Sequence, residues 1–175
     1  MSVDATAAAT QPRPPVSLRP MVKADIDRVM AHEDELFGPE SWTPDSYRAE
    51  LADRRYRHYL IAERVVAERV TAERPAGAQA ELVGWAGLMV VAETAQILTI
   101  GVVPAEQGRG IGQTMLDALL AEARGRAATE VVLEVRIDNL AARRLYERNR
   151  FVPLRIRRGY YDLGRVDAVE MKREL

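Results

Sequence analysis

The chain of 175 residues contains no cysteine and only two histidines. The missing thiols exclude disulfide bonds, zinc sites built from thiolates and any covalent cysteinyl intermediate. His32 and His58 lie far apart in the sequence, and neither has an acidic cluster at ligand spacing beside it. We therefore expect no bound metal and no Ser-His-Asp triad, and both histidines are expected to be surface or packing residues.

Excess charge of one sign and long hydrophobic runs are also missing. The formal net charge is −1, which gives no overall attraction to nucleic acid, so we expect no nucleic-acid partner. The longest apolar run, Leu82 to Ala92, is too short to cross a bilayer. The start of the chain lacks the basic segment and apolar centre of a secretory signal. These absences predict a cytoplasmic protein without membrane association.

The length suits a single domain with a sizeable core. Residues 1–15 are mostly Ala, Thr, Pro and Gln, a composition that predicts a disordered tail before a domain at 16–175. Within that domain, residues 67–80 repeat Ala-Glu-Arg and include Pro-Ala-Gly. With few apolar positions to bury, this segment is predicted to be a solvated hairpin insertion.

Hydrophobic periodicity predicts an α/β fold, in which the strands form a sheet and the helices lie on its faces. Thr43, before Pro44, and Asn139, before Leu140, are good helix N-caps. The predicted helices are 23–36, 44–53, 111–126 and 140–148. The predicted strands are 16–19, 56–66, 82–91, one that ends near residue 103, 130–135, 151–157 and 166–172. Helix 111–126 should form a right-handed crossover between two parallel strands.

The most informative segment is the β-branched run from Leu98 that breaks into glycines and opens onto helix 111–126. Gly108, Gly110 and Gly112 leave room for a ligand near the backbone, and glycine readily adopts a positive φ. The unpaired N–H groups and the dipole at the start of the helix favour negative charge at the same place. The segment therefore predicts a site for an anion such as a diphosphate.

Spacing separates the possible kinds of anion site. A P-loop requires lysine after the last glycine, and a dinucleotide fingerprint requires glycine at position 113, which Gln113 occupies. The pattern that remains is Gln-x-x-Gly-x-Gly, filled by Gln107, Gly110 and Gly112. A plain glycine-rich turn between strand and helix remains the alternative.

A second feature is Glu134, which interrupts the apolar strand Leu133-Glu-Val-Arg136 beside the crossover. Apolar neighbours raise the pKa of a carboxyl group and make it a better proton acceptor near neutral pH, whereas Arg136 would oppose that change. A glutamate at a strand end paired with one of the many arginines is the alternative. Tyr146 follows on the helix that begins after Asn139, where it could either act chemically or pack against Ala142.

Several motifs together resemble the GCN5-related N-acetyltransferases (GNAT). They are the glycine loop, Leu-Glu-Val-Arg136, the Asn139-x-x-Ala-x-x-x-Tyr146 run, and the ending from Arg-Arg-Gly-Tyr-Tyr161 to Asp-Ala-Val-Glu-Met171. The resemblance covers residues 16–175 and is strong from Ile97 onward. Within the family, the chain is similar to enzymes that acetylate protein N-termini. The resemblance implies a mixed, mostly antiparallel sheet of about seven strands, with helices on both faces and a parallel crossover at the acetyl-CoA site.

The resemblance also implies roles for individual residues. Glu134 corresponds to the proton acceptor and Tyr146 to the proton donor, and backbone N–H groups at Gly101 or Val102 would meet the developing oxyanion. The residues implied to bind the cosubstrate acetyl-CoA are Ile100, Gly101, Val102, Gly108, Arg109, Gly110, Ile111, Gly112, Gln113 and Asn139. Those implied to hold a peptide's first residues are Phe37, Tyr160 and Tyr161, which could instead be packing aromatics.

The implied acceptor is a protein N-terminus, and the N-terminal alanine of ribosomal protein S18 is the expected partner. An α-amine with a pKa near 8 is far more often neutral at pH 7.4 than a lysine near 10.4, so it needs less help from the enzyme. Acetylation of lysine or of a small amine, and a non-catalytic acyl-CoA-binding module, remain alternatives. One departure from the family is Asn149-Arg150 where glycine usually precedes the phenylalanine of the sixth strand. We expect Asn149 to take the left-handed cap.

Overall fold

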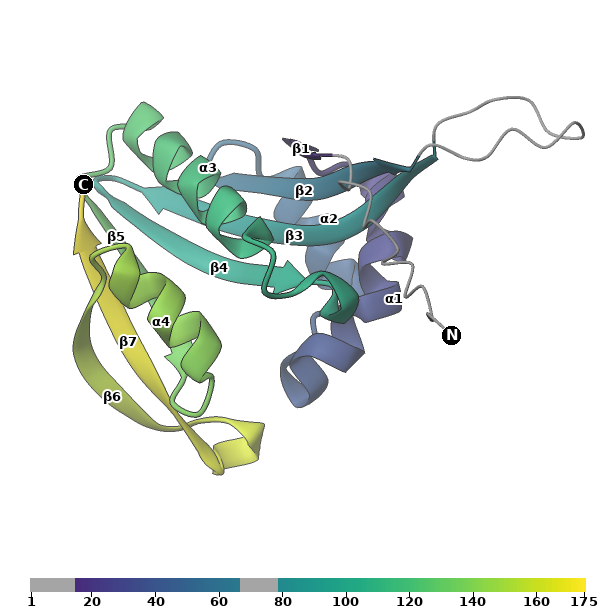
Figure 1. Cartoon of the computed structure of the whole chain (residues 1–175). Helices are drawn as coiled ribbons and strands as arrows, with labels where there is room; N and C mark the ends of the chain where they lie inside the picture. The colour runs from purple at the N-terminus through teal and green to yellow at the C-terminus, as the bar shows by residue number, and fades with distance from the viewer. Residues whose placement is uncertain (1–14, 67–78) are drawn as a thin grey trace, which may run out of the picture.

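The computed structural model describes residues 15–66 and 79–175 (Figure 1). The predicted tail lies outside the described residues except for residue 15. The predicted insertion also lies outside them except for residues 79 and 80, which already belong to strand β3. That strand therefore begins three residues earlier than expected.

Seven strands form one sheet in the order β1-β2-β3-β4-β5-β7-β6. All neighbours are antiparallel except β4 and β5, which are parallel. The strands are β1 (Val16–Pro20), β2 (Arg57–Val66), β3 (Gln79–Val91), β4 (Thr94–Val102), β5 (Glu130–Arg136), β6 (Val152–Tyr161) and β7 (Val166–Glu174). The predicted fold class is confirmed, and β6 extends four residues beyond its predicted end.

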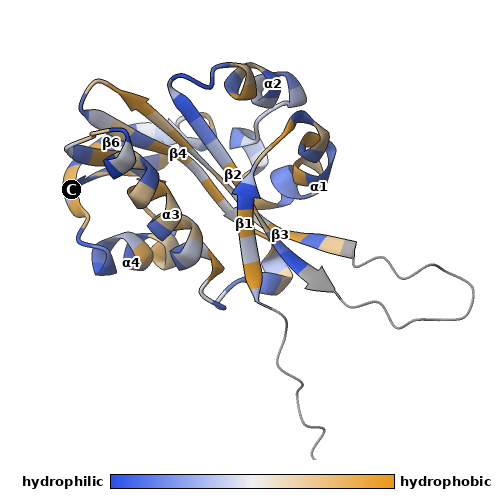
Figure 2. Ribbon diagram, turned by 90° about the horizontal axis from the view of Figure 1, so that it is seen from above, coloured by the Kyte–Doolittle hydropathy of each residue, from blue (hydrophilic) through white to orange (hydrophobic). Residues whose placement is uncertain are grey.

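Within the described residues, four α-helices cover the two faces of this sheet: α1 (Ile26–Phe37), α2 (Pro44–Ala52), α3 (Ile111–Gly125) and α4 (Leu140–Arg148). Helices α1 and α2 lie on one face, and α3 and α4 on the other (Figures 1 and 2). Two buried apolar clusters match this division, one beneath α1 and α2 and a larger one beneath α3 and α4. None of the helices in the described part of the chain is long and apolar enough to span a membrane.

Local sequence signals fix the helices as predicted. Thr43 Oγ1 accepts a hydrogen bond from the Ser46 N–H at 3.1 Å, and Asn139 Oδ1 accepts one from the Ala142 N–H at 3.0 Å. Both side chains therefore satisfy backbone donors that the first helical turn leaves unpaired. The stripe of α3 that packs on the sheet is fully buried. It consists of Ile111, Met115, Leu116, Leu119, Leu120 and Ala123.

The turn before β6 differs from the prediction. Asn149 has an ordinary φ of −94°, whereas Arg150 takes the left-handed conformation with a φ of 64°. The Asn149 amide is instead used in hydrogen bonds, since it exchanges two with the Gln113 amide and donates one to the Leu145 carbonyl. These bonds hold Asn149 in place and leave the left-handed position to its neighbour.

Strands β4 and β5 separate partway along their length. Their parallel pairing joins residues 94–97 to residues 130–133, and β4 carries a bulge at Leu98, opposite the step from Gly87 to Leu88 on β3. Beyond this point β4 continues to Val102 and β5 to Arg136 without pairing to each other. The separation opens the sheet between its two halves, and Figure 1 shows the strands diverging.

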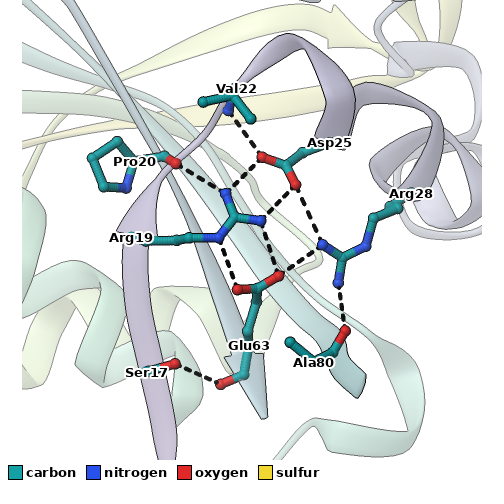
Figure 3. A network of polar contacts seen from close by, with 8 residues as sticks. All are labelled: Ser17, Arg19, Pro20, Val22, Asp25, Arg28, Glu63 and Ala80. Carbon is teal, nitrogen blue, oxygen red and sulfur yellow. Dashed lines mark hydrogen bonds and ion pairs between the residues drawn. The ribbon is translucent and has the colours of Figure 1, made fainter. Parts of the chain in front are cut away.

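A polar network ties the first strand to α1 and β2 (Figure 3). The Arg19 guanidinium donates to the carboxylates of Asp25 and Glu63, and Arg28 donates to the same two groups. Hydrogen bonds from Arg19 hold the pKa of Glu63 below its usual value. Burial alone would raise the pKa of Asp25, but bonds from Arg19 and the Val22 N–H outweigh burial and lower it. Two nearly buried carboxylates are thereby kept charged beside two half-exposed arginines.

Candidate active site

The glycine loop has the conformation that the sequence predicts at two of its three positions. Gly108 and Gly110 have φ values of 73° and 82°, and Gly110 is the N-cap of α3. An added Cβ at either position would meet no atom within 4 Å, so the backbone there is open. The loop thus places the start of a 15-residue helix beside an uncovered stretch of backbone, which suits an anion.

Gly112 and Gly101 have different reasons to be glycine. Gly112 lies inside α3, and an added Cβ would make ordinary contacts, 3.5 Å from Leu145 Cδ2 and 3.9 Å from Val102 Cγ2. Packing therefore does not require glycine there. At Gly101 a Cβ would lie 2.8 Å from the buried Trp85 ring, so packing alone demands glycine at that position.

The two charged or polar side chains of residues 108–113, those of Arg109 and Gln113, both contact other groups of the protein. Arg109 Nη1 lies 3.5 Å from Glu106 Oε2, and its side chain is 39% exposed. Gln113 Nε2 donates to Asp117 Oδ1 and to Asn149 Oδ1, both at 2.9 Å. The Gln113 side chain is therefore committed to the protein, which leaves its backbone N–H as the group that could face a ligand.

A cavity of about 600 Å³ fills the space where β4 and β5 separate. It is lined by residues of both strands, the end of α1 and the segment after it, α4, and the end of β6. Of the predicted site residues, it brings together Phe37, Ile100, Glu134, Asn139, Tyr146, Tyr160 and Tyr161. Gly101, Val102 and residues 108–113 do not line it. The cavity and the glycine loop are thus two separate parts of the site.

Glu134 faces this cavity with both carboxylate oxygens engaged. Oε1 accepts from Arg157 Nη1 at 2.6 Å, and Oε2 accepts from Gln96 Nε2 at 3.1 Å. The side chain is 14% exposed. Arg136, which was expected to oppose a raised pKa at Glu134, instead donates to Asp138 and lies 3.8 Å from Glu40. Glu134 is paired with an arginine, as the alternative interpretation of the sequence had it, and that arginine is Arg157 of β6.

Tyr146 projects from α4 into the cavity and is 7% exposed. Its ring packs edge-on against Phe151, with the centroids 5.7 Å apart, and its hydroxyl forms no hydrogen bond to any described residue. Burial raises the pKa of this phenol to about 12. The hydroxyl is therefore protonated at neutral pH and free to donate.

Aromatic and cationic groups border the other side of Glu134. Tyr161 Oη donates to the Glu134 backbone carbonyl at 3.2 Å, and the ring of Tyr160 stands edge-on to that of Tyr161 at 4.9 Å. The Arg157 guanidinium lies over the Tyr160 ring at 4.4 Å. Burial raises the pKa of Tyr161, and the neighbouring Tyr160 and Glu134 raise it further. Arg157 thus connects the carboxylate to the aromatic border.

A buried carboxylate closes the opposite wall. Glu33 is 1% exposed, and it accepts from the Trp42 N–H at 3.0 Å and from Tyr47 Oη at 2.9 Å. Tyr47 Oη in turn accepts from Trp85 Nε1 at 2.9 Å. Burial raises the pKa of Glu33, and the bonds from Trp42 and Tyr47 oppose that effect.

Several residues that line the cavity or bond to its side chains were not among the predicted site residues. Gln96 is a polar residue within an apolar strand, a signal that could have found it. Glu33 shows only as a polar position on the inward side of α1. Arg157 gives no signal, since its position beside Glu134 depends on pairing between distant strands. Glu40 accepts from the Asp162 N–H across the cavity mouth, a contact between segments 122 residues apart.

With the fold and the site in place, comparison with known proteins identifies the class. Residues 27–151 match the Acetyltransferase (GNAT) family, and the chain belongs to that family. It is an acetyl-CoA-dependent N-acetyltransferase. The parallel pair at β4 and β5 within a seven-stranded sheet is the arrangement found in solved structures of this fold.

Among the relatives is the N-alpha-acetyltransferase RimI of Mycobacterium tuberculosis, 38% identical over 165 residues, or 91% of this chain and 93% of that protein. The crystal structure of the ribosomal-protein-S18-alanine N-acetyltransferase from Escherichia coli superposes with a TM-score of 0.71 at 23% identity. The superposition covers 91% of this chain and 94% of the Escherichia coli chain. Arabidopsis thaliana NAA60 in complex with acetyl-CoA gives a TM-score of 0.72 at 21% identity, covering 92% and 99%.

Proposed function

We propose that this protein acetylates the α-amine of protein N-termini by direct transfer from acetyl-CoA, and that its substrate is the N-terminal alanine of ribosomal protein bS18. The proposal depends on one observation above all. The cavity between β4 and β5 gathers the Glu134 carboxylate, the Tyr146 hydroxyl and four further aromatic side chains, while the chain has no cysteine that could carry an acyl group. The name of the Escherichia coli relative supports the choice of substrate, and that of the Mycobacterium tuberculosis relative supports acetylation of an α-amine.

The diphosphate of the coenzyme would be held outside the cavity by the glycine loop. The positive φ values and open space at Gly108 and Gly110, and the lack of a side chain at Gly112, suit a diphosphate at the start of α3. Backbone groups of Ile100, Gly101 and Val102 and the side chain of Asn139 complete the proposed set, together with Arg109, Ile111 and Gln113. When bound, acetyl-CoA supplies an acetyl group activated as a thioester.

Glu134 is the proposed proton acceptor. An α-ammonium group must lose a proton before its nitrogen can attack, and a carboxylate within reach of it can accept that proton. Each oxygen of Glu134 already accepts one hydrogen bond from the protein, and each has a further lone pair for an amine or a water. Gln96 and Arg157 thus fix the orientation of the carboxylate without filling it.

Tyr146 is the proposed proton donor. With its pKa raised to about 12 by burial, the phenol keeps its proton throughout the neutral range. Its hydroxyl has no hydrogen-bond partner among the described residues, so the proton on Oη is available to the departing sulfur, whose thiol has an ordinary pKa near 8.5. Two different side chains therefore handle the two protons: Glu134 on β5 accepts one from the amine, and Tyr146 on α4 donates one to the sulfur.

The acceptor is proposed to be held by Phe37 on one side of the cavity and by Tyr160 and Tyr161 on the other. These rings present apolar faces with polar edges, which suits the small side chain and backbone of a peptide's first residue. A terminal amine is neutral far more often than a lysine at neutral pH. Both properties favour an N-terminus over an internal lysine.

A panel of acceptors tests the proposal. The protein is incubated with acetyl-CoA and a peptide copying the start of bS18, the same peptide with a blocked N-terminus and an internal lysine, or a polyamine. Mass spectrometry then locates the acetylated nitrogen. We expect acetylation of the free alanine terminus, and preference for the blocked lysine peptide or the polyamine would overturn the proposed substrate.

Two variants test the proposed roles. Glu134→Gln and Tyr146→Phe are each expected to lower kcat by about 10²-fold or more, because each removes one proton-transfer group. Glu130→Gln is the matched control. Glu130 lies on the same strand and face, but its carboxylate bonds to Thr94 and Lys172 outside the cavity. Unchanged kcat in both test variants would contradict the assigned roles.

A further inference from the structure

One wall of the acceptor cavity is a short irregular segment between α1 and α2. Glu40 and Trp42 line the cavity from this segment, beside Leu36 and Phe37 at the end of α1. Between the end of α1 and the start of α2 it has only a single 3₁₀ turn, at residues 38–40. Such a segment has few backbone hydrogen bonds of its own, so something else must hold it in place.

Glu33 makes that connection. It sits on the last turns of α1, and one carboxylate oxygen accepts from the Trp42 N–H at 3.0 Å, nine residues further on. The other oxygen accepts from Tyr47 Oη on α2 at 2.9 Å. One side chain thus ties together both ends of the segment and the helix that follows.

The same contacts continue into the sheet. Tyr47 Oη accepts from Trp85 Nε1 on β3 at 2.9 Å, and the Trp85 ring stands edge-on to Phe37, with the centroids 6.2 Å apart. Glu33, Tyr47 and Trp85 are all at most 1% exposed. The path therefore begins at the cavity wall, passes through buried side chains and returns to Phe37, which is also on that wall.

Burying a carboxylate is unfavourable unless hydrogen bonds compensate it. An apolar side chain at position 33 would fill the space without that cost, but it would leave the Trp42 N–H and the Tyr47 hydroxyl without their acceptor. The particular consequence of having glutamate here is thus a fixed position for the segment that faces the acceptor.

We propose that Glu33 is a positioning residue for the acceptor, which sets the shape of the cavity wall at residues 36–42 through its bonds to Trp42 and Tyr47. The inference rests on the proposed function, because it assumes that the cavity receives the acceptor peptide. Glu33 is assigned no role in coenzyme binding, since residues 108–113 of the glycine loop do not line the cavity.

Kinetics of three variants test the proposal. Glu33→Leu removes both acceptors. Glu33→Gln keeps an oxygen for the Trp42 N–H, and its NH₂ group can donate to Tyr47 Oη, so it is the conservative variant. Tyr59→Phe removes a buried hydroxyl that donates to Glu50 outside this network, and it controls for lost stability alone. We expect Glu33→Leu to raise KM for the bS18 peptide by about tenfold, Glu33→Gln and Tyr59→Phe to stay within about threefold, and KM for acetyl-CoA to stay unchanged in all three.

Intrinsic fluorescence supplies a direct binding measurement. The chain has two tryptophans, Trp42 and Trp85, and both belong to this network. Titrating the peptide in the presence of CoA should change their emission, and Glu33→Leu should weaken the measured peptide affinity while CoA affinity remains that of the wild type. An unchanged peptide affinity in Glu33→Leu, or an equal loss for peptide and CoA, would overturn the proposal.

Hydrogen exchange on the wild-type protein covers the case in which Glu33→Leu does not fold. The Trp42 amide should exchange slowly in the free protein. Adding peptide should slow its exchange further, whereas adding CoA alone should not change it. Rapid exchange of this amide in the free protein would refute the positioning role. A wild-type protein that acetylates no N-terminal peptide would instead refute the proposed function, so the two failures are distinguishable.

Discussion

Adding one methyl group, in the variant Gly112→Ala, tests whether this position is glycine because of packing or because of ligand binding. The position lies in the first turn of α3, with no positive φ, and the nearest atom to an added Cβ would be 3.5 Å away. Alanine is preferred over glycine in a helix by about 0.5–1 kcal/mol. Without a clash to offset this gain, Gly112→Ala should raise Tm by about 2 °C, since 1 kcal/mol shifts Tm by about 2–4 °C in a chain of this size.

The coenzyme should respond in the opposite direction. If a diphosphate approaches the backbone at the start of α3, the same methyl group would hold it away and weaken its bonds to the first-turn N–H groups. We expect affinity for acetyl-CoA to fall about tenfold, equivalent to about 1.4 kcal/mol. Thermal unfolding and calorimetric titration with CoA measure the two effects on one preparation.

Gly125→Ala is the matched control for this experiment. Gly125 ends the same helix, and an added Cβ there would meet nothing within 4 Å. It should raise Tm in the same direction and leave CoA affinity unchanged. Equal CoA affinity for Gly112→Ala and the wild type would refute the coenzyme role of this glycine, and a lower Tm would refute the packing argument.

Three further outcomes follow from the structure. The value of kcat/KM should rise as the α-amine of the peptide deprotonates near pH 8. Because burial raises the pKa of Tyr146 to about 12, kcat/KM should not fall again before about pH 10.5. A decline near pH 10 that is absent in Tyr146→Phe would contradict this expectation. Arg150→Gly should raise stability by about 1 kcal/mol in thermal unfolding, since Arg150 holds a φ of 64°. Glu63→Gln should lower the free energy of unfolding by about 2 kcal/mol at pH 7. This figure already allows for solvent screening, because Arg19 and Arg28 are half-exposed. The wild-type pKa of Glu63 is lowered on folding, so its advantage over the variant should be complete above about pH 5 and shrink as pH falls through the folded pKa, as denaturant titrations at pH 7 and pH 3 would show.

The elements whose signals are local were predictable from the sequence. Asn139 caps α4 at the predicted residue, and the apolar stripe of α3 is buried as its spacing requires. The positive φ values of Gly108 and Gly110 follow from the same reasoning, because only neighbouring residues and the helix start determine that turn. In each case a few consecutive residues contain the whole physical cause.

Contacts that depend on register between distant strands were not predictable. Arg157 reaches Glu134 because β6 pairs Arg157 with Ala168 on β7, while β7 pairs Glu170 with Glu134 on β5. The bulge in β6 between Pro153 and Arg155 changes which side chains share a face, and no periodicity in the sequence indicates it. The sequence indicated only that one of its many arginines could pair with Glu134, and it did not indicate which one.

The two parts of the site differ in the same way, and this difference explains why the class of enzyme is easier to infer than its acceptor. The part proposed to hold the coenzyme's diphosphate is one loop and one helix start, encoded by the consecutive residues Gln107 to Gln113. The acceptor cavity is assembled from α1, β4, β5, α4 and β6, and its walls are fixed by contacts such as those of Glu33 with Trp42 and of Glu40 with Asp162. A substitution at any of these long-range contacts can reshape the cavity while the glycine loop stays intact. Acceptor specificity should therefore change through residues that carry no local motif, and the proposed variants at Glu33 test that consequence directly.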